Sequence, residues 1–423
     1  MKVTFSNKEK SWMFYDWGSS AFTLIITTAV FPIFYKAQAS SVGIEGHVST
    51  AYLGYTIAIF TFILAMLGPV LGSIADYDGL KKRFFIGFLS VGLLSTVSLV
   101  FVPDGNWFLL LLLFTFASLG STGANIFYDA FLVDITKDKR MNRVSARGFA
   151  LGYIGSTIPF IISIAIIVFA QQEILPITST TASRIAFLIT CVWWGIFALP
   201  LVKNVHQVYA IPRENKIIKK SFLRLYKTIL DIKQYKYLSL FLLAYFFYID
   251  GVGTIISMST AYGTDVGISA TVLLIVLLMT QIVAAPFALL YGKLADRFSA
   301  KVMINIGCIV YIIICIYAYF LETAIDFWIL AMLVATSQGG IQALSRSYFA
   351  KLIPKNKANE FFGFYNIFGK FASITGPLLI GITAQLTGRS NTGILSLIVL
   401  FIIGMIILFF VPSDKKLEHT PIN

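Results

Sequence analysis

The stretch GSIADYDGLKKR, residues 72–83, decides how this chain is interpreted, because it stands between two long apolar runs. It holds two aspartates, a glycine suited to a turn and three consecutive basic residues. A second version, GKLADRFSAK at residues 292–301, repeats the glycine, alanine, aspartate and lysine at an offset of 220 residues. Basic loops between membrane spans are common and would explain the lysines alone. The repeated G-x-x-x-D at a single offset instead indicates a chain built from two similar halves.

The composition identifies the class of protein. Of the 423 residues, 57% are hydrophobic and 13% are charged, whereas a soluble domain carries about 25% charged residues. The three cysteines and three histidines form no metal-binding pattern and no disulfide framework. The sequence also lacks G-x-x-x-x-G-K-[ST], H-E-x-x-H and G-x-S-x-G. These features predict a membrane protein with no metal, no cofactor and no catalytic residue, and they argue against an ATP-driven pump and an enzyme.

Helical spans account for this composition. The apolar runs divide into segments of about 20 residues, and that length crosses a hydrocarbon core of about 30 Å as a helix. The twelve segments cover residues 13–36, 50–74, 84–102, 107–132, 147–170, 184–203, 237–262, 269–292, 302–321, 326–350, 361–386 and 392–412. We therefore predict an all-α membrane protein with twelve transmembrane helices in two pseudo-symmetric bundles of six.

The basic residues predict the orientation, since lysine and arginine concentrate in cytoplasmic loops. With the N-terminus in the cytoplasm, 29 of the 33 basic residues lie on that side, three lie outside and one, Lys370, lies within a span. Both termini are therefore predicted to be cytoplasmic. This distribution explains the net charge of +13 without a nucleic-acid partner. Short loops and the lack of targeting tails favour a bacterial cytoplasmic membrane, with a eukaryotic organelle as the alternative location. We expect the protein to be a monomer.

The longest polar stretch divides six spans from six spans. We predict an N-terminal bundle over residues 1–203, a cytoplasmic linker over 204–236 and a C-terminal bundle over 237–423. Within the linker, Ile217, Phe222, Leu225 and Ile229 recur at helical spacing. This pattern indicates an amphipathic helix at the membrane surface, and a plain tether with some helix is the alternative.

Polar side chains recur at i, i+3 or i+4 in several spans, so they share one face of each helix. Ionisable groups inside a span face a cavity or a partner. Two bundles that surround a central polar cavity would explain this pattern. The outer surface of the bundles is expected to contact the lipid bilayer. The candidate solute- or ion-binding residues are Asp250, Lys370, Asp16, Asn125, Gln338, Gln342 and Asn366.

Asp250 and Lys370 lie deepest, near the middle of spans seven and eleven. We interpret Asp250 as a site for a proton or a substrate ammonium group, with a fixed structural ion pair as the alternative. Lys370 is its counter-ion, an anchor for a substrate carboxylate, or a lysine whose long stem reaches the interface. Asp16 is shallower, and capping of the first helical turn is its alternative role. The four uncharged amides either bind a polar solute or hold helices together.

Longer stretches of the sequence resemble a known family. They are FYDWGSSAF (14–22), RGFALGYIG (147–155), YIDGVGTI (248–255), GGIQALSRSYFAKLIP (339–354) and FFGFYNIFGKFASITGP (361–377). With the twelve spans and the doubled turn, they resemble the major facilitator superfamily of secondary transporters. Within it, the chain is most similar to the "unknown major facilitator" branch, which includes the autophagy-related vacuolar amino-acid effluxers of fungi. The resemblance covers nearly the whole chain, and the last two stretches are its most specific part.

The resemblance implies alternating access, in which the two halves rock about a site near the membrane midplane. It also implies that the turn at residues 72–83 is a gate element. Its Asp76 would hold the halves together on the cytoplasmic side while the cavity opens outward, with Asp296 as the weaker counterpart. The second turn departs from this pattern, because Ser299 replaces the glycine and one base replaces three, which puts a symmetric gate in doubt. The expected gate residues are Gly72, Asp76, Gly79, Lys81, Lys82, Arg83, Asp296, Arg143 and Arg147.

Charge pairing is also predicted beside the gate. We expect the two aspartates at the end of span four to form a salt-bridge cluster with nearby arginines, and Arg346 to pair in the same layer. The members of this cluster are Asp129, Asp134, Arg140, Arg143 and Arg147.

The predicted function is secondary active transport, as a symporter or antiporter, of a small polar solute such as an amino acid. Proton coupling through Asp250 is part of this prediction. The alternative is a non-transporting membrane receptor or scaffold that senses a ligand in the same cavity. Solute flux into liposomes separates the two functions.

Overall fold

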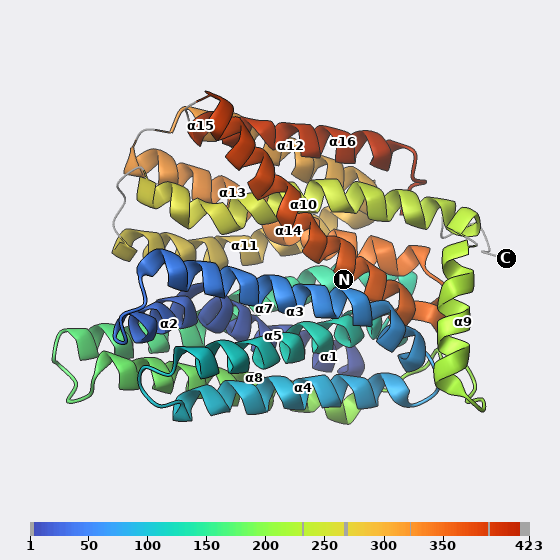
Figure 1. Cartoon of the computed structure of the whole chain (residues 1–423). Coiled ribbons are helices and arrows are strands. Elements are labelled where there is room, and N and C mark those ends of the chain that lie inside the picture. The colour runs from blue at the N-terminus through green and yellow to red at the C-terminus, as the bar shows by residue number, and fades with distance from the viewer. Residues whose placement is uncertain (1–3, 231, 266–269, 322, 388–389, 415–423) are drawn as a thin grey trace.

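The computed structural model describes residues 4–230, 232–265, 270–321, 323–387 and 390–414. Long helices running side by side build the molecule (Figure 1). The helices before the linker are α1 (Asn7–Ala21), the π-helical η1 (Phe22–Ala29), α2 (Val30–Ser40), α3 (Gly46–Ala75), α4 (Leu80–Ser98), η2 (Leu99–Phe101), α5 (Trp107–Ala130), α6 (Leu132–Ile135), α7 (Asp138–Gln171) and α8 (Ser179–Asn204). The linker and the second half contain α9 (Ile217–Leu230), η3 (Ile232–Tyr235), α10 (Lys236–Asp265), α11 (Ala270–Phe298), α12 (Ala300–Tyr319), α13 (Ala324–Leu352), η4 (Lys355–Lys357), α14 (Ala358–Thr387), α15 (Ser390–Ser396) and α16 (Ile398–Phe409).

The helices confirm an all-helical membrane protein. In the part of the chain that is described, 11 helical segments are long and apolar enough to cross a membrane. The count of twelve stays a prediction that depends on α14, a further helix of 30 residues.

Several helices extend beyond the apolar segments that predicted them. The first crossing begins at Asn7 rather than at residue 13, and α7 begins at Asp138 rather than at residue 147. Hydropathy locates only the part of a helix that lies in hydrocarbon. A capping box marks the start of α1, whereas α7 begins without a side-chain cap. Ser6 and Glu9 form such a capping box before α1. The π-helical stretch within the first crossing was not predicted either, since hydropathy does not distinguish it from α-helix.

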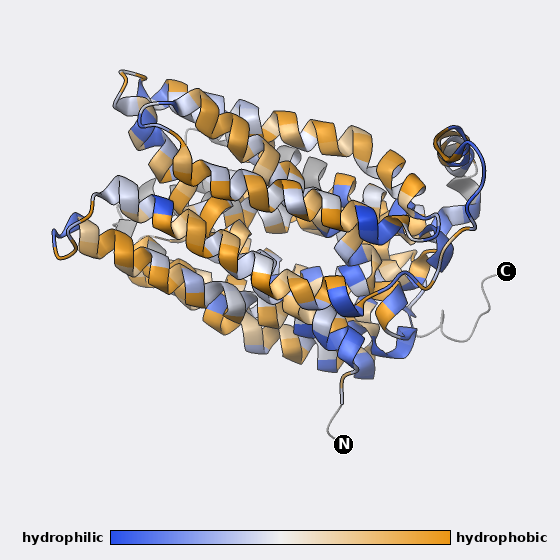
Figure 2. Cartoon of the chain, turned by 90° about the horizontal axis from the view of Figure 1, so that it is seen from below, coloured by the Kyte–Doolittle hydropathy of each residue, from blue (hydrophilic) through white to orange (hydrophobic). Residues whose placement is uncertain are grey.

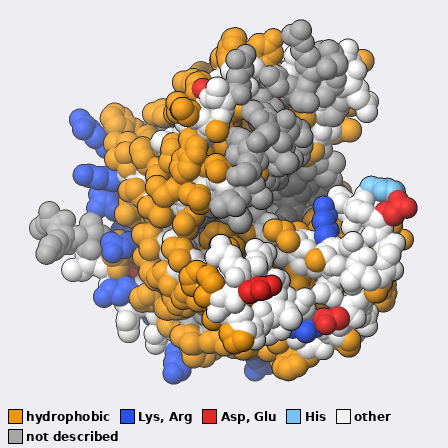
Figure 3. Space-filling view, turned by 90° about the vertical axis from the view of Figure 1, so that its left-hand side faces the viewer, with side chains coloured by type: hydrophobic (Ala, Val, Ile, Leu, Met, Phe, Trp, Pro, Cys, Tyr) orange, Lys and Arg blue, Asp and Glu red, His pale blue; other side chains and the backbone are white. Residues whose placement is uncertain are grey.

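The two ends of the bundle differ in charge. We call the end that carries residues 76–83, 137–147 and 353–358 the charged end. Hydrophilic residues gather there, while hydrophobic ones cover much of the length of the helices (Figure 2). At the opposite end, the acidic and basic side chains are scattered among apolar and uncharged polar ones (Figure 3). Under the predicted orientation the charged end faces the cytoplasm.

Close helix approaches join the two halves. α3 packs on α14, and α7 packs on α11 and α13. A Cβ atom at Gly72 of α3 would lie 2.3 Å from the carbonyl oxygen of Asn359 on α14. One at Gly292 of α11 would lie 2.4 Å from the Cβ of Ala146 on α7. The glycine that the two turns share therefore has one physical role, which is to let helices from different halves approach closely.

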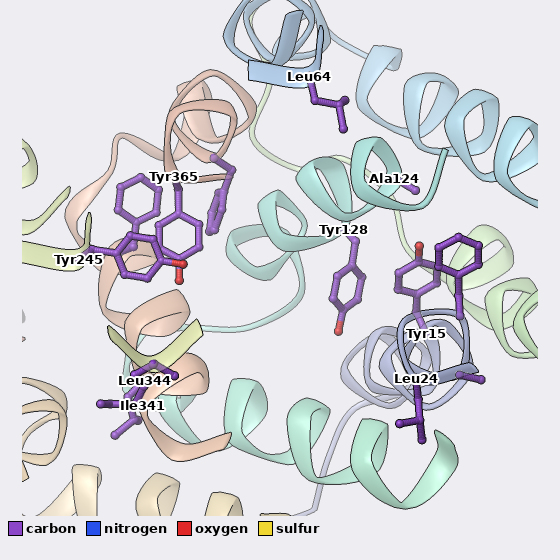
Figure 4. Packing of buried hydrophobic residues seen from close by; sticks show 14 of the residues in the cluster. Tyr15, Leu24, Leu64, Ala124, Tyr128, Tyr245, Ile341, Leu344 and Tyr365 are labelled. Atoms are coloured by element: carbon purple, nitrogen blue, oxygen red, sulfur yellow. The ribbon is translucent and has the colours of Figure 1, made fainter. Parts of the chain in front are cut away.

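Aromatic rings fill the interior on both sides of the boundary between the halves (Figure 4). The rings of Tyr245 on α10 and Tyr365 on α14 are stacked with centroids 4.3 Å apart. The rings of Tyr15 on α1 and Tyr128 on α5 lie 4.6 Å apart. These contacts hold together, in pairs, four of the helices that carry candidate site residues.

Candidate functional site

Arg346 of α13 is the centre of a buried ionic cluster that joins the two halves. Its Nη2 donates to Oδ2 of Asp16 at 3.2 Å, and its Nη1 donates to Oδ1 of Asp129 at 3.1 Å. Its Nε donates to Oγ of Ser145 at 2.9 Å. The three acceptors belong to α1, α5 and α7. One side chain of the second half therefore binds three helices of the first.

The charge balance of this cluster is uneven. Two carboxylates face one guanidinium, so these groups carry an excess negative charge when both acids are ionised. The side chain of Arg346 is 4% exposed, and those of Asp16 and Asp129 are each 14% exposed. An uncompensated charge inside a membrane protein is costly unless a proton or a cation neutralises it. The cluster is therefore chemically suited to take up a proton or a cationic group.

Aromatic faces surround the guanidinium. The rings of Trp12 and Phe149 lie 4.6 and 4.4 Å from it, and that of Tyr128 lies 5.5 Å away. Such contacts stabilise a cation by electrostatic attraction to the ring face. Trp12 is itself fixed, since its indole N–H donates to the carbonyl of Tyr128 at 2.8 Å. The rings therefore hold the guanidinium in one position between the two acids.

The predicted amide residues flank this cluster. Gln338 and Gln342 precede Arg346 at four-residue spacing, so all three share one face of α13. Asn125 is half-buried on α5, one turn from Asp129. Asn366 of α14 interacts with Asp129 of the cluster, and its side-chain amide also donates to the Phe362 carbonyl of its own helix at 3.0 Å. The first crossing carries further polar residues after Asp16, namely the half-buried Ser20 and the exposed Thr23 and Thr27.

The described hydrogen bonds of Asp250 involve other residues than those of the Arg346 cluster. It is fully buried on α10, where its Oδ1 accepts from the backbone N–H of Gly376 at 3.0 Å and from Thr254 at 3.4 Å. Its Oδ2 has no hydrogen-bond donor among the described residues. These contacts join α10 to α14 within the second half. The side chain of Lys370, its predicted counter-ion, lies outside the described residues.

The first charged turn joins the halves through Asp76. Its Oδ1 accepts from the backbone N–H and the side-chain amide of Asn359 at 2.9 and 2.8 Å, and its Oδ2 accepts from the N–H of Glu360 at 3.3 Å. These N–H groups belong to the first turn of α14, where helices leave donors free and attract anions. Burial raises the pKa of Asp76 to about 7, although neighbouring positive charges and the Asn359 donors act to lower it.

The second charged turn makes a simpler contact. Asp296 of α11 pairs with Arg143 of α7, across the same boundary. Both side chains are partly exposed, at 21% and 40%. A further ion pair joins Lys355 to Asp138 at 3.0 Å. Among the described residues, the hydroxyl of Ser347 on α13 also donates to Oδ1 of Asn142 on α7 at 2.9 Å, so the halves meet at the charged end through several separate polar contacts.

The remaining expected gate residues lie elsewhere. Gly79 shapes the first turn with a φ of 69°, a conformation that favours glycine. Lys81 is fully buried inside the first half, where it donates to Asp134 at 2.6 Å. Lys82 contacts His206, and Arg83 is exposed. Arg147 lies over the ring of Phe5, 4.8 Å from its centroid.

Arg346 pairs in this layer as predicted, since it binds Asp129, but the pairing predicted between the aspartates of span four and the arginines of residues 140–147 is wrong. Asp129 pairs with Arg346 and Asp134 with Lys81, not with the arginines that follow them in the sequence. Those arginines lie on α7, and two of them, Arg140 and Arg143, pair instead with Glu9 of α1 and Asp296 of α11. Nearness in sequence did not predict these ion pairs, because the arginines of α7 contact other helices than the one that carries the aspartates.

Sequence reasoning also missed residues that take part in the contact. Asn359 and Glu360 supply the donors for Asp76, and a helix start shortly after Pro354 was the available signal. Arg224 of α9 lies 3.5 Å from Asp76 and 3.1 Å from Glu360. Its spacing placed it in the predicted linker helix, but nothing in the sequence indicated which face of that helix meets the protein.

Comparisons with known proteins agree with this architecture. A family model described as "Vacuole effluxer Atg22 like" matches residues 6–420. The chain is 63% identical over 418 residues to "Uncharacterized MFS-type transporter YxiO" of Bacillus subtilis (strain 168), which covers 99% of this chain and 98% of the relative. It is 23% identical over 438 residues to "Autophagy-related protein 22" of Eremothecium gossypii, with 89% and 85% covered.

Solved structures share the fold. FucP, a major facilitator superfamily transporter in the outward conformation, matches with a TM-score of 0.71 at 13% identity, over 96% of this chain and 98% of FucP. The proton:xylose symporter XylE matches with a TM-score of 0.70 at 12% identity, over 98% of each chain. At these identities the likeness concerns the fold alone.

Proposed function

The chain belongs to the Atg22-like family of major facilitator transporters, and from this premise we propose that it is a secondary transporter working by alternating access. Its solute is small and polar, such as an amino acid, and its transport is coupled to protons. It acts as a monomer in a bacterial cytoplasmic membrane, and the Bacillus relative supports this location. Both termini and the charged end face the cytoplasm.

The observation that carries the proposal is the position of the contacts between the halves. The ion pairs Arg143–Asp296 and Lys355–Asp138 and the bonds from Asn359 to Asp76 all lie at the charged end. At the opposite end, the described ion pairs, such as Arg184–Asp104, stay within one half. This asymmetry is expected of an outward-facing transporter whose cytoplasmic side is closed.

The Arg346 cluster supports the coupling step. A proton or a substrate ammonium group that neutralises Asp16 or Asp129 would weaken its attraction to the guanidinium. Because Arg346 belongs to the other half, this change would alter the contact between the halves. A ligand shifts an equilibrium only through its different affinities for the two states, and a site divided between the halves provides such a difference. Asp250 remains a second candidate proton site, since it is buried near the middle of α10.

Transport in proteoliposomes tests the proposal. Purified protein is reconstituted and offered radiolabelled amino acids and other small polar solutes. Exchange is measured at equal concentrations, and accumulation is measured under an inward and under an outward proton gradient. Protein-free liposomes are the control. We expect saturable exchange of at least one solute class, and its accumulation when protons are driven inward or outward. A solute that raises the melting temperature but is never transported would favour the receptor or scaffold alternative.

Matched variants then assign the coupling site. Asp16→Asn or Asp129→Asn should abolish accumulation but leave part of the exchange, because each mimics a permanently protonated acid. Asp250→Asn should behave like the wild type if the Arg346 cluster couples alone. Loss of accumulation in Asp250→Asn, with normal accumulation in the other two variants, would move the coupling site to Asp250.

A further inference from the structure

The linker helix α9 has an apolar outer face that the described part of the chain leaves uncovered. The helix runs across the direction of the spans at the charged end (Figure 1) and is seen almost end-on at the flank of the bundle in Figure 2. Ile218, Phe222, Tyr226 and Leu230 follow at four-residue spacing, with exposed fractions of 64%, 53%, 59% and 61%. Contiguous apolar surface of this kind marks an interaction site.

Basic residues border this apolar face. Lys216, Lys219, Lys220 and Lys227 are all exposed on or next to α9. A helix that combines an apolar face with flanking lysines suits the boundary between acyl chains and anionic headgroups. Since α9 lies beside the ends of membrane-crossing helices and runs across them, the bilayer surface is the occupant that fits both its place and its charge.

The inner face of α9 is small and polar. Ser221 and Thr228 are buried against the protein, and their hydroxyl groups have no hydrogen-bond donor or acceptor partner among the described residues. The carbonyl of Ser221 accepts from the hydroxyl of Ser73 on α3 at 3.2 Å. Among the described side chains of α9 no apolar one is fully buried, and Ile217 and Leu225 are only half-buried, so the described contacts of this helix with the bundle are mainly polar.

Arg224 extends from this inner face to both halves at once. Its Nη2 donates to the Ser73 hydroxyl at 2.9 Å and lies 3.5 Å from Oδ2 of Asp76, both in the first half. Its Nε donates to Glu360 of α14, in the second half, at 3.1 Å. The guanidinium also lies over the ring of Tyr77, 5.2 Å from its centroid. Separation of α3 from α14 would force Arg224 to release one of its carboxylates.

We propose that the outer face of α9 binds the anionic surface of the cytoplasmic leaflet, and that this binding keeps Arg224 bridging the two halves. Anionic lipid then stabilises the closed charged end. The lipid fixes α9 in the pose from which Arg224 reaches Asp76 and Glu360, and the polar inner face does not fix it alone. We call the bridge that Arg224 forms between the two halves the latch. The latch rests on the alternating-access proposal, whereas the lipid contact does not depend on that proposal.

The lipid contact is tested by fluorescence quenching. Phe222→Cys is labelled with an environment-sensitive fluorophore, in a background without the native cysteines, and the protein is placed in nanodiscs that contain nitroxide-bearing lipids. Position 222 should be quenched, and the quenching should increase when phosphatidylglycerol replaces part of the phosphatidylcholine. Equal and weak quenching in both lipids, as for a water-exposed label, would overturn the lipid contact.

The latch is tested by distances between spin labels at Lys139→Cys and Asn356→Cys, which are exposed positions in different halves at the charged end. Changing from phosphatidylcholine to a mixture with phosphatidylglycerol should raise the ratio of short to long distances by about threefold or more, given the attraction of several lysines. Unchanged distances together with normal quenching would leave α9 as a lipid-binding helix and overturn the latch.

Variants separate the two faces of α9. Replacing the four lysines by glutamine should remove the lipid dependence of the distances, and Arg224→Gln should remove it while leaving the quenching intact. Lys137→Gln with Lys203→Gln is the matched control, because it removes exposed basic residues outside α9 at the same end. An equal loss in this control would replace a specific role of α9 with a general charge effect. These measurements need no transported solute, so they are independent of whether flux is found.

Discussion

The two charged turns occupy corresponding places in the two halves, but they contact the opposite half through different chemistry. Each follows a glycine that allows two helices to approach closely. In the first turn, Asp76 is 1% exposed and accepts hydrogen bonds from the start of α14. In the second, Asp296 forms a single, partly exposed ion pair with Arg143.

This difference shows that the close approach of the helices between the halves and the free energy of the polar contacts there have different causes. The shared glycines give both turns the same close approach. A buried carboxylate with several donors becomes costly when those donors leave, because its desolvation is no longer compensated. An exposed ion pair contributes about 0–1 kcal/mol and is screened by salt. We therefore expect the first turn to dominate the closed state of the charged end.

The largest effect is expected from Asp76→Ala. The substitution leaves the first-turn N–H groups of α14 without their acceptor and removes one of the acceptors of Arg224, which should shift the equilibrium towards an open charged end by about 2–3 kcal/mol. Spin-label distances between positions 139 and 356 measure the shift. Asp78→Ala is the matched control, since the Asp78 side chain is exposed in the same turn. Equal distances in Asp76→Ala and the wild type would remove Asp76 from the gate.

The sequence allowed one part of this comparison to be predicted. Gly72 and Asp76 are close in sequence, so the repeated pattern identified two related helix ends. The basic residues after them looked like one cluster, yet successive residues on a helix point about 100° apart. Lys81 therefore turns inward to Asp134 while Arg83 points outward.

The Arg346 cluster was much less predictable. Arg346 is 330 residues from Asp16 and 217 from Asp129, so no local pattern relates them. Each of these residues lies in a polar stripe of its own helix. The stripes identified candidate polar residues but did not show which of them form ion pairs with one another. Which stripes meet depends on how the halves dock, and the docking is decided by close contacts such as that of Gly292 with Ala146.

A smaller effect is expected from pH. Burial raises the pKa of Asp76 to about 7 in the closed state, whereas an aspartate in water has a pKa of about 3.9. The closed state therefore binds a proton more tightly than an open state in which Asp76 is hydrated. This stabilisation is fully present at low pH and is lost as the pH rises through about 7. Between pH 8 and pH 6 the closed state should gain about 1 kcal/mol.

The same spin-label pair measures this dependence on pH. Asp76→Asn should remove the slope, because the amide does not titrate. A slope that persists in Asp76→Asn would assign the titration to other acids, with Asp16 and Asp129 as the first to test.

A still smaller shift is expected from Asp296→Ala. The ion pair with Arg143 is exposed enough for water and salt to compete with it, so its loss should open the charged end by about 0.5 kcal/mol or less. The shift should decrease at high salt, and adding Arg143→Ala should change little more. A shift as large as that of Asp76→Ala would make the gate energetically symmetric and contradict the comparison.

The smallest effect concerns the residue that replaces glycine in the second turn. Ser299 has a φ of 132°, and its Oγ caps α12 by accepting from the N–H of Val302 at 3.2 Å. Ser299→Gly relieves the backbone strain but loses the cap, so the free energy of unfolding should change by less than about 0.5 kcal/mol. Ser299→Ala keeps the strain and loses the cap, and should destabilise by about 1 kcal/mol. Thermal melting in detergent ranks the two variants, and a larger loss for Ser299→Gly than for Ser299→Ala would show that the serine backbone is unstrained.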